Sequence, residues 1–213
     1  MKKLILFFFC AIAAFPSDIS HSIDFENDAV NTFPEGWTSK DKTNMVKVYK
    51  INKEDNNKFL HATADKISVT IGFDKEWHLS DYPKLKWRWR PIEMPIGTNE
   101  KIKSGNDDVL GVYVLFGGFP IPKTIKYIWS ETLPIGTILE SPYSAKTKMI
   151  VIKTGEDGLN EWHGESRNVL EDYRSLFGES GAKPTAKGIA VLTDSDNTAT
   201  HVTGDYDDFV ITK

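Results

Sequence analysis

The chain has 213 residues, of which 40% are hydrophobic and 26% are charged, and its formal net charge is −4. This length suits a single domain with a sizeable core. The balance of 26 Lys and Arg against 30 Asp and Glu, without a basic block, argues against a nucleic-acid partner, because binding phosphates requires clustered basic side chains.

The N-terminus has the pattern of a signal peptide. Two lysines precede an apolar run at 4–15, which is shorter than the roughly 20 residues that a membrane-spanning helix needs. Ser20-His21-Ser22 places small residues at positions −3 and −1 of a cut after Ser22, whereas a cut after Ala13 would leave an apolar start. We therefore predict a signal peptide at 1–22, a single β-sandwich domain at 23–213, and no membrane span after cleavage.

Cys10 is the only cysteine. It follows Phe9 rather than a small residue, so we do not expect a lipoprotein. Without this segment the mature protein has no thiol, which excludes cysteine nucleophiles, thiolate metal sites and disulfides. Export without disulfides is typical of a bacterial envelope, and we predict a periplasmic or secreted protein.

From residue 23 onward, short runs rich in Val, Ile, Thr and aromatic residues are separated by Gly, Pro, Asn and Asp. These runs predict strands near 46–51, 58–63, 66–72, 84–90, 109–116, 124–130, 147–153, 187–193 and 206–212. In 84–90, Leu85, Trp87 and Trp89 alternate with lysines and arginines, as in an antiparallel sheet with one face on a core. The basic residues then form a solvated sheet face, or alternatively a phosphate-binding stripe. The apolar run at 109–116 is typical of a central strand.

One segment has helical periodicity instead. Between Val169 and Phe177, apolar residues recur with the spacing of a helix face, Asn168 is suited to cap the start, and Gly178 to end it. The whole pattern predicts an all-β fold: an antiparallel two-sheet jelly-roll β-sandwich with one short helix near 169–177.

Four blocks together carry a resemblance to a known family: "LKWRWR", "NDDVLGVYVLF", "EWHGESRNVLEDYRSLFG" and "TDSDNTATHVTGDYDDF". Over nearly all the mature chain, the sequence resembles the bacterial extracytoplasmic domain-of-unknown-function family 3047, which implies no assigned activity. The family pattern implies a basic residue a few positions after the paired acids Asp107-Asp108. This chain has Val109-Leu110-Gly111-Val112 there.

A more distant resemblance is to galactose-binding-like jelly-roll carbohydrate-binding modules. Phe25-Glu26, Gly36-Trp37 and the paired acids Asp207-Asp208 carry it. This resemblance implies a structural Ca²⁺ between the first and last strands. Since calcium takes six to eight oxygen ligands, we expect the metal ligands to be Glu26, Asp28, Asp207 and Asp208.

The acids near the C-terminus have other interpretations. Asp194, Asp196, Thr198 and Asp205 fit positions of an EF-hand loop, but Ala199 replaces its required glycine and the flanks are strand-like. The simpler interpretation is that Asp194, Asp196 and Asn197 are hairpin turn residues.

Candidate ligand-binding residues lie around an apolar loop and at three charged positions. Phe119 lies in a Gly- and Pro-rich loop that is either tucked under the sandwich or forms the rim of a site, and Tyr127 and Trp129 share one face of the next strand. The charged candidates are Asp107, Asp108 and Arg167. The two aspartates are alternatively turn residues at a strand start.

Catalytic motifs are absent: no G-x-S-x-G, P-loop or dinucleotide fingerprint occurs. The weak candidates for an acid–base pair are Glu165 and Asp172, although Arg167 and Asp172 alternatively form a structural pair at a strand–helix corner. His163 lies between two carboxylates, a pattern that more often belongs to a solvated face.

These observations favour a non-catalytic module that binds a carbohydrate or another envelope polymer, with a structural calcium. The alternatives are a glycan-acting hydrolase or lyase, and an envelope assembly or adaptor protein. The sequence does not choose a ligand, a protein partner or an oligomeric state.

Overall fold

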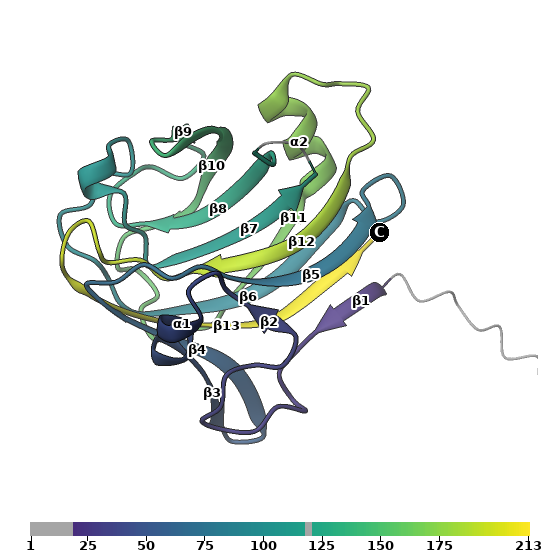
Figure 1. Cartoon of the computed structure of the whole chain (residues 1–213). Coiled ribbons are helices and arrows are strands. Elements are labelled where there is room, and N and C mark those ends of the chain that lie inside the picture. The colour runs from purple at the N-terminus through teal and green to yellow at the C-terminus, as the bar shows by residue number, and fades with distance from the viewer. Residues whose placement is uncertain (1–18, 118–120) are drawn as a thin grey trace, which may run out of the picture.

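The structure, a computed structural model, describes residues 19–117 and 121–213 and is a jelly-roll β-sandwich of two curved sheets, one above the other (Figure 1). Sheet A has the order β11-β6-β13-β4-β3, and β1 also pairs with β13. Its strands are β1 (Ile19–Ile23), β3 (Tyr49–Glu54), β4 (Asn57–Asp65), β6 (Lys84–Glu93), β11 (His163–Asn168) and β13 (His201–Thr212).

Sheet B has the order β2-β5-β12-β7-β8-β10-β9. Its strands are β2 (Trp37–Thr38), β5 (Ile71–His78), β7 (Leu110–Phe116), β8 (Thr124–Ser130), β9 (Ile138–Ser141), β10 (Ser144–Thr154) and β12 (Thr185–Leu192). The central position of β7, between β12 and β8, confirms the prediction from its apolar sequence. One pair departs from the expected antiparallel pattern: β10 runs parallel to β8.

The predicted helix near 169–177 is α2 (Val169–Phe177), with the expected ends. The side chain of Asn168 accepts a hydrogen bond from the amide of Glu171 at 3.2 Å, and Gly178 ends the helix with a φ of 67°. Val169 and Tyr173 are buried, and the Tyr173 ring packs against Phe116 at 4.7 Å between ring centroids. The helix thereby closes one end of the sandwich (Figure 1).

The strand expected at 46–51 is only partly correct. The chain forms a second helix, α1 (Lys42–Val48), before β3 begins at Tyr49. Asp41 caps α1 by accepting a hydrogen bond from the amide of Asn44 at 3.0 Å, so the capping residue outweighs the strand preference of 46–48. Likewise, the strand expected at 66–72 starts only at Ile71, as β5.

The core lies between the inner faces of the two sheets. Alternation along β6 buries Leu85, Trp87 and Trp89, as the sequence predicts. The rings of Trp87 and Trp89 are 5.5 Å apart, and they meet Tyr127 and Trp129 of β8 across the sandwich at 5.4 and 5.9 Å. Aromatic pairs of this kind add about 0.5–1.5 kcal/mol each beyond their buried area. This aromatic stack fixes β6 against β8.

The segment assigned to a signal peptide lies almost wholly outside the described residues. Its last residues, Ile19–Ser22, belong to β1, which pairs antiparallel with β13. A cut after Ser22 would leave only Ile23 of that strand. None of the helices in the described part of the chain has the length and apolar character needed to cross a bilayer.

Candidate functional site

The outer face of sheet B carries a group of charged side chains drawn from three separate segments. Asp107 and Asp108 precede β7, Lys126 projects from β8, and Asp194 follows β12. These four residues are 0%, 0%, 3% and 4% exposed, in the order in which they are named above. We call these four residues the acid–lysine cluster. Buried charges are costly unless they are paired, so each residue's partners matter.

Asp108 and Lys126 form a buried ion pair through Oδ1 and Nζ. Burial alone would lower the pKa of Lys126, but the charges of Asp108, Tyr113 and Asp194 raise the pKa above its usual value, so the ammonium stays protonated. The ammonium also lies 5.2 Å from the centre of the Tyr113 ring. Gly111 leaves room for the pair, because a Cβ there would lie 2.7 Å from Asp108 Oδ2.

Asp194 is the least compensated member of the cluster. Burial raises the pKa of its carboxyl to about 9, and the nearby Asp108, Asp107 and Asp196 add to the shift while Lys126 opposes it. Its Oδ1 and the Oδ2 of Asp108 are buried and have no hydrogen-bond partner among the described residues. Both oxygens are therefore available to accept hydrogen bonds or to bind a cation.

Asp107 accepts hydrogen bonds from the loop after β12. Its Oδ1 accepts hydrogen bonds from the backbone amide and the side-chain amide of Asn197, at 3.2 and 3.0 Å. Its Oδ2 accepts from the backbone amide and hydroxyl of Thr198, at 2.7 and 2.6 Å. Asp107 thus holds the loop after β12 against the start of β7, which confirms that it is a turn-stabilising residue.

A pocket of about 350 Å³ opens beside the cluster. Lys126, Tyr113 and Asp194 line it on the sheet side, and Tyr143, in the β9–β10 turn, lines it on the other. The remaining lining residues are mostly hydroxyl- and amide-bearing: Ser68, Asn106, Ser141, Ser144, Thr147 and Asn197. Tyr143 is 57% exposed, and its hydroxyl donates to Asn197 Oδ1 at 2.7 Å. We call this the polar pocket.

A second, larger pocket of about 680 Å³ lies on the same face of sheet B, over β5 and β12. We call this the sheet groove. Its lining includes Gly72, Gly188 and Ala190, which present at most a methyl group, so the sheet surface is open there. Ser68 lines both pockets. We call the two adjoining hollows the extended recess.

Comparison with known protein families shows which family the chain belongs to. Residues 35–210 match the model of the family described as "Protein of unknown function (DUF3047)". The chain belongs to the DUF3047 family. No curated protein sequence matches it.

Several solved structures resemble this DUF3047 chain, at low sequence identity. TmCBM61, solved with β-1,4-galactotriose, is 12% identical with a TM-score of 0.39, over 90% of this chain and 99% of that one. Endoglucanase 3 of Trichoderma harzianum, from family GH12, is 9% identical with a TM-score of 0.45, over 94% and 99%. The CBM22-1 xylan-binding domain of Paenibacillus barcinonensis Xyn10C is 13% identical with a TM-score of 0.38, over 94% and 97%.

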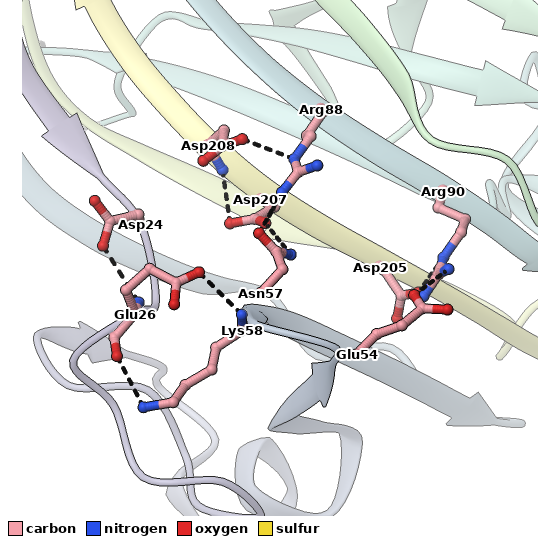
Figure 2. A network of polar contacts seen from close by, with 10 residues as sticks. All are labelled: Asp24, Glu26, Glu54, Asn57, Lys58, Arg88, Arg90, Asp205, Asp207 and Asp208. Carbon is pink, nitrogen blue, oxygen red and sulfur yellow. Dashed lines mark hydrogen bonds and ion pairs between the residues drawn. The ribbon is translucent and has the colours of Figure 1, made fainter.

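The four acids expected to bind calcium are not brought together as a metal site. Figure 2 shows Arg88 between Asp207 and Asp208, with nitrogen–oxygen distances of 2.6 and 2.7 Å. Glu26 accepts instead from the backbone amide of Lys58 at 3.0 Å, and Asp28 from that of Glu35 at 2.8 Å. Protein groups therefore contact each of these carboxylates, and among the described residues the four acids do not converge as a group with metal-ligand spacing.

The arginines of β6 take part in ion pairs on the outer face of sheet A. Arg90 pairs with Asp205 at 2.8 Å and with Glu54 at 2.8 Å, as Figure 2 shows. Trp162 covers both Arg88 and Arg90, at 4.7 and 4.8 Å from its ring. This face is a partly solvated network of ion pairs, and it accounts for three of the C-terminal acids.

Two of the candidate ligand-binding residues lie in the core. Tyr127 is 0% exposed and Trp129 is 1% exposed, and the indole of Trp129 donates to the carbonyl of Gly155 at 2.9 Å. They do share one face of β8, as expected, but this face points inward to the aromatic stack and not to a surface ligand. Phe119 lies outside the described residues.

Glu165, Arg167 and Asp172 do line a common pocket, of about 290 Å³, between β11, α2 and β10. Arg167 holds Asp172 with two hydrogen bonds of 2.6 and 3.1 Å, which confirms the structural pair, and the Tyr127 hydroxyl donates to Asp172 at 2.8 Å. Glu165 accepts from the Trp89 indole at 3.3 Å. Burial raises the pKa of Glu165, although Lys153 opposes the shift. We call this the edge pocket.

Sequence reasoning missed Lys126, Tyr113 and Tyr143. The available signal for Lys126 was that it is the only charged residue in the strand sequence TIKYIWS. In this DUF3047 chain, the cation beside the paired acids comes from the neighbouring strand β8 rather than from β7. Asp194 was expected in a turn, but it is buried and forms a bridge with Ser68.

Proposed function

We propose that this DUF3047 protein is an exported, non-catalytic module that binds a carbohydrate polymer along the outer face of sheet B. The observation that carries this proposal is the extended recess in which the polar pocket and the sheet groove share Ser68. A chain-like ligand fills two adjoining hollows on one face better than a compact metabolite does.

The chemistry of the polar pocket suits a polyhydroxylated ligand. Sugar hydroxyls donate hydrogen bonds, and the buried Oδ1 of Asp194 is an acceptor without a partner in the described structure. Tyr143 offers an exposed aromatic face at the mouth, against which a pyranose ring packs its apolar side. A pocket with few, well-placed polar groups and an aromatic wall is typical of small-ligand and oligomer sites.

Retention of the protein on a panel of immobilised polysaccharides tests this proposal. We expect Tyr143→Ala to weaken retention at least tenfold, with the fold unchanged by circular dichroism, because it removes the exposed stacking surface. Trp162→Ala is the matched control, since it removes an aromatic side chain from the opposite face. Passage of the wild type through a broad panel, or loss of retention in Trp162→Ala alone, would overturn the proposal.

A second candidate function has one specific observation in its favour. Glu165 and Asp172 line the same edge pocket, and burial raises the pKa of Glu165. A carboxyl with a raised pKa in the same pocket as a second carboxyl is the pattern of glycoside hydrolysis. Turnover of soluble glycans that disappears in Glu165→Gln would favour a glycan-acting enzyme over a binding module.

A further inference from the structure

Three carboxylates, two of which line the polar pocket, have the spacing of a cation site. One oxygen from each of Asp107, Asp194 and Asp196 lies within 4.8 Å of the other two. Calcium binds oxygens at about 2.3–2.6 Å, so ligands on opposite sides of one ion are separated by about 5 Å. The three oxygens are therefore close enough to contact a single ion with small side-chain adjustments.

An independent observation points to a ligand rather than to chance crowding. The Oδ1 of Asp194 is buried without a hydrogen-bond partner in the described chain, and the residue is only 4% exposed. Lys126, the buried cation of the cluster, contacts Asp108 instead. A buried carboxylate oxygen is costly unless something compensates it, and Asp194 also offers one oxygen to the group that it forms with Asp107 and Asp196.

Asn197 supplies a further oxygen. Its amide nitrogen lies between the two flanking carboxylates, 3.0 Å from Asp107 Oδ1 and 2.5 Å from Asp196 Oδ1. Rotation of the amide by half a turn would place its oxygen at this position, as a metal ligand. The Tyr143 hydroxyl donates to that oxygen at 2.7 Å, and a tyrosine hydroxyl can also accept a hydrogen bond from the amide nitrogen. The rotation therefore costs no hydrogen bond to Tyr143.

We propose that Asp107, Asp194 and Asp196, with the side-chain oxygen of Asn197, bind a divalent cation, Ca²⁺ in particular. All four ligands are oxygens on irregular loops, which suits calcium better than metals that prefer nitrogen or sulfur. This site is distinct from the four acids that the sequence pointed to. The proposal does not depend on carbohydrate binding, although a cation here would face the same pocket and could also bind sugar hydroxyls.

The test uses the purified full chain, stripped with EDTA and dialysed. We expect added Ca²⁺ to raise the melting temperature by several degrees, because a ligand bound only by the folded state stabilises it. Terbium, a luminescent substitute for calcium, should give emission excited through the nearby Tyr143, and excess Ca²⁺ should quench it.

Three variants locate the site. Asp196→Asn changes an exposed residue and keeps its size, so it should fold normally and weaken Ca²⁺ binding at least tenfold. Asp194→Asn should do the same if it folds. Asp208→Asn, on the other sheet, should leave binding unchanged. An absence of any calcium shift, or a shift that survives in Asp196→Asn, would overturn the proposal.

The same preparations separate this inference from the proposed function. Retention on polysaccharide is measured in EDTA and again with Ca²⁺. Retention that persists in EDTA, with no calcium shift in melting temperature, would overturn the cation site and leave the binding module standing. A calcium shift without retention would support the cation site and count against the module.

Discussion

Lys126 and Asp108 are 18 positions apart in the chain, yet they form an ion pair that is almost fully removed from water. The pair joins the end of the loop before β7 to the middle of β8. Because a buried charge needs its partner, this contact also fixes the wall of the polar pocket.

Lys126→Met should therefore strongly destabilise the protein. Removing one partner leaves the carboxylate of Asp108 buried and uncompensated, which costs about 3–5 kcal/mol. Urea unfolding measures the loss. Combining Lys126→Met with Asp108→Asn should recover part of it.

A surface pair is the control for this prediction. Lys187 and Glu76 are 2.6 Å apart, with side chains that are 49% and 59% exposed. Lys187→Met should cost much less stability than Lys126→Met, because solvent screens exposed pairs. If Lys126→Met and Lys187→Met lowered the free energy of unfolding equally, burial would not be the reason that the Lys126–Asp108 pair matters.

Gly111→Ala should disturb the same pair by steric contact. The new Cβ would lie 2.7 Å from Asp108 Oδ2 and 2.9 Å from Lys126 Cε, both closer than atoms tolerate. We expect a loss of about 1–3 kcal/mol in the free energy of unfolding, as for other overpacked sites. Gly164→Ala, in β11, meets no atom within 4 Å and should be neutral or slightly stabilising.

Ala199→Gly should stabilise the protein. Ala199 adopts a φ of 54°, in the left-handed region, where a side chain costs about 1–2 kcal/mol. Glycine removes this strain but adds about 0.5–1 kcal/mol of unfolded-state entropy, so the net gain should be about 0.5 kcal/mol. Ala190→Gly, in β12, should instead destabilise the protein. In thermal melts, the melting temperature should therefore rise in Ala199→Gly and fall in Ala190→Gly.

Stability should depend on pH through Glu165. Burial raises the pKa of this carboxyl in the folded state above its ordinary value, so the folded protein holds the proton more tightly than the unfolded chain. The stabilisation is complete below the unfolded-state pKa and is lost as the pH rises through the raised pKa of the folded state.

The comparison with glutamine isolates this contribution. Glu165→Gln cannot ionise, so its free energy of unfolding should fall less than that of the wild type as the pH rises from 4 upward. Glu161→Gln changes an exposed glutamate in the same region and should follow the wild type. Parallel wild-type and Glu165→Gln curves would show that the burial of Glu165 has no such effect.

Features that depend on near neighbours in the chain were predicted from the sequence. Alternation in β6 put Trp87 and Trp89 in the core, and the caps Asn168 and Gly178 set the ends of α2. The four blocks carried the family resemblance, which the match over residues 35–210 confirms. Competing local signals caused errors, as at α1, where the Asp41 cap outweighs the strand preference of the residues that follow.

The sequence by itself determined the β-sandwich, the short helix and the burial of alternate side chains, because each depends on spacing along one segment. Only the tertiary structure decided which charges meet. Asp107 binds a loop about ninety positions away in the sequence, and Arg88 forms an ion pair with Asp207, which is also remote in the sequence. Lys126, on β8, forms the ion pair with Asp108 that no residue of β7 provides. Such contacts depend on strand order and register, which bring remote segments together, and no local pattern encodes them.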